Sequence, residues 1–491
     1  MKLKIAIYPI VEGMSGDYQI ADHINLSSKA PALGFNPITD LYKDKNNPDA
    51  IIVACLKAGT RPNEEEIKVL QANGVKAYCY DLAEPVLYAA ARNETVEAIG
   101  FVPKLPEAFE FYATSSGMKA DSSKLDLAIA VSKVPCYYAA SFTNNKVRAA
   151  CVENNLAIYN SGKAVRALIA NSGNANACTG TQGDLNDQKL RQAIASRFNI
   201  EPSEVLTAST GKIGVQLEIE QMLTRIKEAP QAQALDFAEA ILTTDLVSKV
   251  YQSKNILGIS KGSGMIHPNM KQATMLAFLF TDCKLKAFAG DEMQAKFRDC
   301  LQQAIELSFN SISVDGDTST NDMVILVSSG QGPEIEAESF QDQLNQVCTE
   351  LAKKIVLDGE GTTKLVELEL EGLGNNELAR KVARQVLNSA LVKTAIFGND
   401  PNWGRLVAAL GQALAEHGLD ADLNQVSLEL LRQKLYQDAM PTEFDRDKLI
   451  AAMKQNKTIS IKFKLAEGES VKVWSSDLSY DYVRINAEYF T

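Results

Sequence analysis

The sequence predicts an α/β protein, with α+β features, in which short apolar strands alternate with longer helices. The apolar runs are short and bounded by glycines and polar turns, as expected for buried strands. The segments between them have a helical period and capping residues. The chain has 491 residues, of which 46% are hydrophobic and 23% charged, so it can form two or three domains with large cores.

Residues 1–102 read as a separate small α/β domain. Segments 50–55 and 75–80 are strand-like, as is 5–10, and Pro62 is suited to the first turn of a helix between the first two. A strand, a helix and a strand within about thirty residues favour a right-handed crossover between parallel strands. No Gly-x-Gly-x-x-Gly fingerprint occurs here, so we expect an accessory or assembly domain without chemistry of its own.

From residue 103 the alternation of strands and helices continues to the C-terminus. Most predicted strands are apolar runs that end in a polar turn, and we interpret the last one as buried. We expect strands at 125–131, 137–142, 147–152, 165–169, 323–327, 365–370 and 477–486, and helices at 187–198, 217–228, 234–247, 292–309, 336–357, 375–390 and 406–417.

Composition argues against several classes of protein. The formal net charge of −11 disfavours a nucleic-acid-binding surface, and no apolar stretch is long enough to span a membrane. The N-terminal residues show no signal-peptide pattern, so we expect a cytoplasmic protein. Eight scattered cysteines without a C-x-x-C pair favour reduced thiols and no zinc site, and three histidines make a histidine-rich metal site unfavourable. We also expect no bound cofactor.

The stretch 258–282 joins a glycine-rich loop to an apolar run. Its glycines permit backbone angles that other residues avoid, and Pro268 stiffens the loop. The run 275–280 reads as a fully buried strand or the start of a buried helix. One interpretation is a loop that simply leads into the core. The other is a self-cleaving bond between Ala273 and Thr274 that releases Thr274 as an N-terminal nucleophile.

Four other loops contain candidate polar residues. Loop 171–180 either presents donors to a ligand or satisfies its own backbone through Asx-turns, and its composition favours the second. The Ser-Thr-Gly turn at 209–211 can direct backbone N–H groups at an oxyanion. Glu360 is either a ligand-facing carboxylate or a turn residue. Segment 313–322 is similar to a calcium loop but lacks the required Gly and Glu, so we expect a polar turn.

Over roughly four-fifths of its length the sequence resembles the ornithine acetyltransferase (glutamate N-acetyltransferase) family. No single motif is specific enough to show this resemblance, but several motifs occur in the same order along the chain. The motifs are Ser-Gly-Asn-Ala-Asn-Ala-Cys-Thr-Gly at 172–180, Ser-Thr-Gly at 209–211, Lys-Gly-Ser-Gly-Met-Ile at 261–266, Ala-Thr-Met-Leu at 273–276, the polar turn at 313–322, Asp-Gly-Glu-Gly at 358–361, Asp-Pro-Asn-Trp-Gly-Arg at 400–405 and the tail 481–491.

The resemblance implies a layered core of sheets and helices that cuts itself between Ala273 and Thr274, giving core segments 103–273 and 274–491. Thr274 is then the nucleophile, and its freed amine is the general base. The resemblance assigns the oxyanion hole to Thr210 and Gly211. It assigns substrate binding to Thr210, Lys261, Thr274, Glu360, Asn486 and Thr491.

The implied reaction is a ping-pong transfer of acetyl from N-acetylornithine to glutamate in arginine biosynthesis. Acetyl-CoA serves some family members as an alternative acetyl donor. The implied assembly is a heterotetramer of two cleaved chain pairs. Two departures from the family pattern stand out: Lys271-Gln272 looks like an insertion just before the cleavage site, and residues 1–102 are an extension that the family lacks.

Three alternatives remain beside this reading. The chain is a related transferase with a different amino-acid substrate, an N-terminal-threonine amidase or aminopeptidase that uses water as acceptor, or an uncleaved relative without activity. The insertion at Lys271-Gln272 is the feature that supports the last of these.

Overall fold

The computed structural model describes Pro103 and residues 105–119, 121–268, 275–422 and 424–488, together with three short strands nearer the N-terminus. The chain divides into two compact units, 1–102 and 103–491. In the first unit, β1 (Asp22–Ile24), β2 (Asp40–Lys43) and β3 (Val53–Cys55) pair antiparallel in that order. β3 falls within the predicted strand 50–55. The other predicted elements of this unit, and their parallel crossover, lie outside the described residues.

The second unit contains a nine-stranded sheet built around one long strand, β5 (Leu127–Phe142). Its first half pairs with β4 and β6, and its second half pairs with β14. The strands predicted at 125–131 and 137–142 are therefore one strand. The pairing with β6 shifts in register between Val131 and Cys136. Pro135 lies within this irregular part of the strand, where proline is tolerated although it cannot donate a backbone hydrogen bond. The other strands are β4 (Phe109–Thr114), β6 (Val165–Asn174), β7 (Val205–Lys212), β8 (Gln231–Ala232), β9 (Lys249–Gln252), β10 (Ile256–Lys261), β11 (Leu276–Thr281) and β14 (Met323–Ser328).

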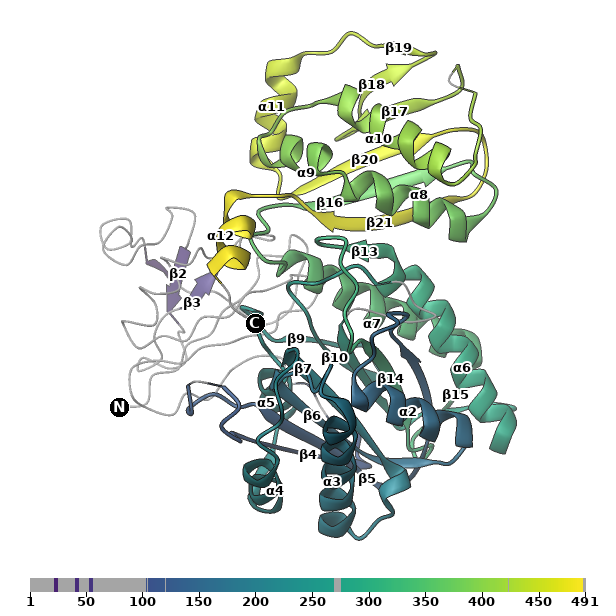
Figure 1. Cartoon of the computed structure of the whole chain (residues 1–491). Coiled ribbons are helices and arrows are strands. Elements are labelled where there is room, and N and C mark those ends of the chain that lie inside the picture. Colours follow the sequence, from purple (N-terminus) through teal and green to yellow (C-terminus); the bar gives the residue numbers. More distant parts are fainter. Residues whose placement is uncertain are drawn as a thin grey trace. The chain divides into compact units, whose positions relative to one another are not determined.

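The two halves of this sheet pack face to face, with helices on both outer sides (Figure 1). Alternation along each strand produces the layers. In β11, Phe278 and Phe280 enter the core between the halves, whereas Leu279 faces the helices on one outer side. That outer side is covered by α6 (Gly290–Leu307) and α7 (Ala337–Leu357), and the other by α3 (Gly180–Phe198) and α4 (Ile219–Glu228).

This unit also contains a sheet of seven strands (Figure 1) and a small pair, β12 (Lys284–Leu285) with β15 (Glu334–Ile335). The apolar face of the seven-stranded sheet packs against helices, while the other face carries alternating Glu and Lys side chains paired across strands, such as Lys462 with Glu369 and Glu371. In order its strands are β13 (Ile312–Ser313), β21 (Ser470–Ser476), β16 (Leu365–Glu371), β20 (Thr458–Lys464), β17 (Ser427–Leu430), β18 (Gln433–Gln437) and β19 (Met440–Pro441); the helices are α8 (Asn376–Asn388), α9 (Ala390–Phe397), α10 (Trp403–Glu416) and α11 (Arg446–Gln455).

Three predicted elements were wrong. Segment 147–152 leads into a helix, α2 (Ala150–Ser161), because a short apolar run does not distinguish a strand from a buried helix turn. Helix α5 (Ala234–Ala240) ends earlier than the predicted 234–247, since Asp245 Oδ2 accepts from the backbone N–H of Thr243 at 3.0 Å and stabilises a turn instead.

The predicted buried strand 477–486 is also wrong: most of it is an exposed helix, α12 (Tyr480–Glu488). None of the helix residues is buried, and Tyr480 is 85% exposed. The Ser479 hydroxyl accepts from the backbone N–H of Tyr482 at 3.4 Å, and Asp481 lies in the first turn, where an acidic side chain is favourable. The alternating Tyr residues concealed this helix start.

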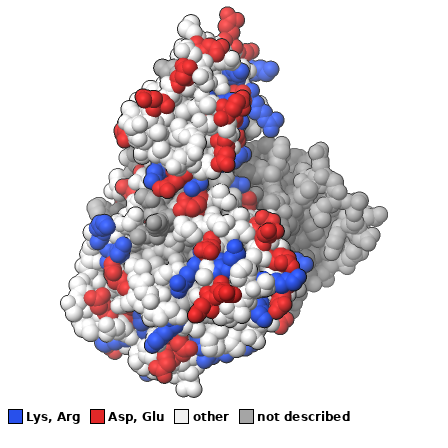
Figure 2. All heavy atoms as spheres, turned by 90° about the vertical axis from the view of Figure 1, so that its right-hand side faces the viewer, with Lys and Arg blue, Asp and Glu red and all other residues white. Residues whose placement is uncertain are grey.

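The surface carries charges of both signs. Figure 2 shows acidic and basic side chains intermixed over one face, with no extended field of one sign on the described part of that face. Among the described residues, no helix combines the length and the apolar character that crossing a membrane requires. The six cysteines in this part of the chain form no disulfide, and all but Cys178 are buried.

Candidate active site

Five of the site residues predicted from the sequence line one pocket of about 180 Å³. They come from the ends of separate elements: Thr210 and Gly211 from the end of β7, Lys261 from the end of β10, Glu360 from the turn after α7, and Asn486 from α12. The wall also includes Met275 and Leu276 at the start of β11, whose register pairs Leu276 with Lys261. Ala273, Thr274 and Thr491 lie outside the described residues.

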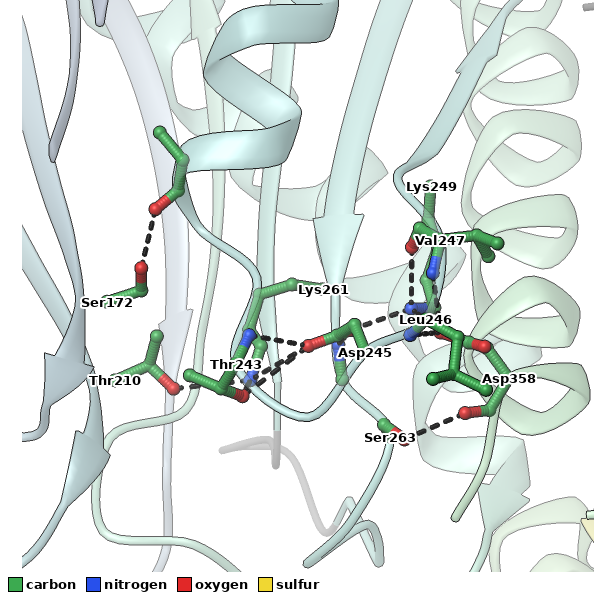
Figure 3. Close-up of polar contacts among 12 residues, drawn as sticks. Ser172, Thr210, Thr243, Asp245, Leu246, Val247, Lys249, Lys261, Ser263 and Asp358 are labelled. Carbon is green, nitrogen blue, oxygen red and sulfur yellow. Dashed lines mark hydrogen bonds and ion pairs between the residues drawn. The ribbon is translucent and has the colours of Figure 1, made fainter. Parts of the chain in front are cut away.

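The Lys261 ammonium contacts two hydroxyls of the pocket wall and a buried carboxylate behind it (Figure 3). Its Nζ donates to the Thr243 hydroxyl at 2.7 Å and to the Thr210 hydroxyl at 3.3 Å, and lies 3.6 Å from Asp245 Oδ2. A lysine ammonium only donates, so the Thr210 oxygen is the acceptor in their contact. The proton of the Thr210 hydroxyl is therefore available to another acceptor, such as an oxyanion in the pocket.

Asp245 is a fully buried carboxylate that holds this arrangement in place. Its Oδ1 accepts from the backbone N–H of Gly262 at 2.6 Å, one residue beyond Lys261. Burial alone would raise the pKa of Asp245, but the ammonium groups of Lys249 and Lys261 outweigh burial and lower it well below the ordinary range. Asp245 therefore remains ionised and attracts Lys261 at any physiological pH.

Gly211 is required by the close approach of two strand ends. Its φ is +130°, which side-chain-bearing residues rarely adopt, and an added Cβ would lie 2.3 Å from the carbonyl carbon of Gly173. Gly173 and Gly211 are also partners in the parallel pairing of β6 and β7. Residues 209–211, predicted as a turn, are therefore the end of β7, and glycine at 211 lets them lie against the end of β6, next to the pocket.

Glu360 faces the pocket, in agreement with the ligand-facing alternative. Its Oε2 accepts from Asn486 Nδ2 at 2.9 Å, and its backbone N–H donates to the Ser263 carbonyl at 3.0 Å. An added Cβ at Gly264 would lie 2.5 Å from the Glu360 carboxyl group. Glycine at 264 is therefore what allows the carboxylate to lie against the glycine-rich loop.

The described part of the loop before Thr274 is anchored by buried polar contacts. The backbone N–H groups of Met265 and Ile266 donate to Asp315 at 2.7 and 2.8 Å. Arg384 of α8 donates to the Pro268 carbonyl and to His267 Nε2, the latter at 2.8 Å. Because Arg384 only donates, neutral His267 carries its proton on Nδ1, which lies 3.0 Å from the Ser313 hydroxyl.

Loop 171–180 satisfies part of its own backbone, as in the alternative that its composition favoured, and pairs its remaining amides with neighbouring segments. The side-chain amides of Asn171 and Asn176 donate to the carbonyls of Asn174 and Gly183 at 2.8 and 2.9 Å. Asn174 Oδ1 accepts from the backbone N–H of Asn176 at 2.8 Å. Of the whole loop, only Ala175 lines the pocket.

Several pocket residues were not identified from the sequence. The polar turn 313–322 contributes Ser319, Thr320, Asn321 and Asp322 to the wall, although it was read as structural. Thr243 also lines the pocket, and both it and the buried Asp245 were placed inside a predicted helix. The available signal was their position, since a Thr-Thr-Asp sequence just before an apolar strand is typical of a turn.

A sequence model of the ArgJ family matches residues 110–491. The chain belongs to the ArgJ family. It is 42% identical over 396 residues to the arginine biosynthesis bifunctional protein ArgJ of Thermus thermophilus, covering 79% of this chain and 99% of that protein. The protein of the same name from Lactococcus lactis is 42% identical over 402 residues, covering 77% of this chain and 98% of the relative.

A crystal structure of arginine biosynthesis bifunctional protein ArgJ from Bacillus halodurans is similar at 36% sequence identity, with a TM-score of 0.40, and covers 44% of this chain and 100% of that one. The ArgJ match confirms the family predicted from the ordered motifs. It begins at residue 110, so the first unit lies outside it.

His267, in the loop before Thr274 that Arg384 holds in place, makes the stability of the fold depend on pH. Burial, reinforced by the Arg384 guanidinium, lowers its pKa to about 3 from the ordinary 6.5. Below about pH 6.5 the unfolded chain therefore takes up a proton that the folded chain does not. We expect this residue to lower the free energy of unfolding by up to about 1.4 kcal/mol per pH unit as pH falls from 6.5 towards 3.

Urea unfolding at pH 7.5, 6 and 5 checks this expectation. His267→Gln, whose amide oxygen can still accept from Arg384, should lose less stability on acidification than the unmodified chain. His417→Gln, at the end of α10, is the matched control. An acid dependence that is identical in His267→Gln and in the unmodified chain would contradict the assignment.

Proposed function

We propose that this chain transfers acetyl from N-acetylornithine to glutamate, with Thr274 as the nucleophile. Membership of the ArgJ family makes the chain an acyltransferase of arginine biosynthesis. One observation supports the assignment of the site: Thr210, Gly211, Lys261, Glu360 and Asn486 line the same pocket as the residue that follows Thr274. Residues so far apart in sequence have a common ligand as their simplest explanation.

The first proposed step is self-cleavage. The Thr274 hydroxyl oxygen attacks the carbonyl carbon of Ala273, the peptide C–N bond breaks, and the proton passes to the freed amine. Water then hydrolyses the resulting ester, which gives chains 1–273 and 274–491. The new α-amine, with an ordinary pKa of about 7.7–8.0, is suited to act as the general base for its own hydroxyl near neutral pH.

Acetyl transfer follows in two half-reactions. The Thr274 oxygen attacks the acetyl carbon of N-acetylornithine, and the oxyanion accepts from the Thr210 hydroxyl and the Gly211 backbone N–H. The C–N bond breaks, ornithine leaves with the proton held by the Thr274 amine, and an acetyl ester remains. The amine of glutamate then attacks this ester, which releases N-acetylglutamate and regenerates the threonine hydroxyl.

The charges of the pocket suit amino-acid substrates. Lys261 offers an ammonium to an α-carboxylate, and Glu360 offers a carboxylate to an ammonium group. Asn486 and Thr491 are proposed to add hydrogen bonds. We propose that no cofactor is needed, that acetyl-CoA is an alternative donor, and that the enzyme is a cytoplasmic heterotetramer of two cleaved pairs.

Cleavage and transfer are tested together with Thr274→Ala. The purified unmodified chain should run as two bands on a denaturing gel, despite Lys271-Gln272, and should transfer acetyl from N-acetylornithine to glutamate. Thr274→Ala should remain one band and lose transfer, because it has no hydroxyl. Acetate release without glutamate at the rate of transfer would show an amidase, and an uncut, inactive unmodified chain would exclude the proposed mechanism.

Gly264→Ala tests the position of the Glu360 carboxylate. The new methyl group must displace the end of a flexible side chain, so stability should change little while binding geometry is lost. We expect kcat/KM to fall by about 10- to 100-fold, as for displacements near 1 Å. Gly411→Ala, where an added Cβ meets no atom, is the matched control and should retain full activity. Unchanged kinetics in Gly264→Ala would refute this role of Glu360.

A further inference from the structure

Lys249 carries a charge in the interior of the protein, away from the pocket surface. Its side chain, on β9, is fully buried, and the side chains of its two carboxylate partners, Asp245 and Asp358, are at most 2% exposed. Its Nζ donates to Asp245 Oδ1 and to Asp358 Oδ2, both at 2.7 Å, and to the Val247 carbonyl at 3.2 Å. All three donors of the ammonium are thus used, and no donor is left for a ligand.

One carboxylate partner of Lys249 leads to the cationic side of the pocket (Figure 3). Asp245 accepts from Lys249 through Oδ1, and the same oxygen accepts from the Gly262 backbone N–H. Its other oxygen lies 3.6 Å from the ammonium of Lys261. The end of β10, with the Lys261 side chain, is therefore connected to Lys249 through a single carboxylate.

The other carboxylate partner leads to the anionic side. Asp358 precedes the turn that carries Glu360, and its Oδ2 also accepts from the Leu246 backbone N–H at 3.0 Å. Its backbone carbonyl accepts from the Ser263 hydroxyl at 2.8 Å, and the Ser263 carbonyl accepts from the Glu360 backbone N–H at 3.0 Å. Segments 261–263 and 358–360 are thus joined both through Lys249 and directly.

From these contacts we infer that Lys249 is a positioning residue that sets the spacing between Lys261 and Glu360, and through it the affinity of the pocket for its amino-acid substrates. This inference rests on the proposed function for the identity of the substrate. The physical reason is that one ammonium bound to two carboxylates fixes the separation between the segments that carry Asp245 and Asp358. Contacts between uncharged side chains are less directional and would fix this separation less strictly.

The chain offers a control for a purely structural role. Arg191 and Asp187 form another buried ion pair, 2.8 Å apart and at most 6% exposed, and neither lines the pocket. Removing this pair should weaken the fold as removal of Lys249 would, without altering the pocket. A difference in substrate binding between the two pairs therefore separates positioning from stability.

The test compares Lys249→Met/Asp358→Asn with Arg191→Met/Asp187→Asn, each of which removes one positive and one negative charge. Lys249→Met alone leaves two carboxylates facing each other, so the double variant guards against failure to fold. For Lys249→Met/Asp358→Asn we expect KM for N-acetylornithine and for glutamate to rise about tenfold or more, with kcat changed less than about threefold. The control should keep both KM values and show lower stability alone.

Equal KM values in the two double variants would overturn the inference, and so would a loss confined to kcat. Ornithine binding, measured by calorimetry on the same proteins, separates this result from failure of the proposed function. If the unmodified chain transfers no acetyl, the proposed function is wrong, and ornithine binding alone then tests the role of Lys249. Weaker ornithine binding by Lys249→Met/Asp358→Asn than by the control then supports the positioning role. Equal binding by the two variants, or no binding by either, overturns it.

Discussion

An ammonium group withdrawn from water must be paired, and the pairing of Lys249 is the constraint on which the pocket depends. Its partners come from two segments, the turn before β9 and the end of α7. Their sequence positions lie 4 and 109 residues away. Satisfying one buried charge therefore brings together the loops that present Lys261 and Glu360. The need to pair the buried Lys249 ammonium thus also fixes where the two loops lie relative to each other.

The layered sheets provide the frame for this pairing. Because alternate residues of β11 enter two different cores, the strand is held from both faces and its start is fixed beside Lys261. Two helices of the C-terminal part add further contacts: Arg384 of α8, which packs on the seven-stranded sheet, donates to the Pro268 carbonyl, and Asn486 of the exposed helix α12 donates to Glu360. These helices therefore contact both the loop before Thr274 and the turn that carries Glu360.

Local patterns predicted much of this architecture. The run 275–280 was compatible with a buried strand, and β11 is one. Segments 147–152 and 477–486 failed because short apolar or alternating runs fit both periods, and the capping contact of Ser479 is visible only in three dimensions. The site was predicted through its ordered motifs. The pairing of Lys249 with Asp358 leaves no local pattern, since neither residue is unusual in its own segment.

In the proposed mechanism Thr274 carries the acetyl group between donor and acceptor. Intact-mass spectrometry of the purified chain, after incubation with N-acetylornithine and no glutamate, tests this step directly. We expect a fragment beginning at Thr274 that is one acetyl group heavier and that returns to its original mass when glutamate is added. An enzyme that transfers acetyl while this fragment never gains the extra mass would contradict this mechanism.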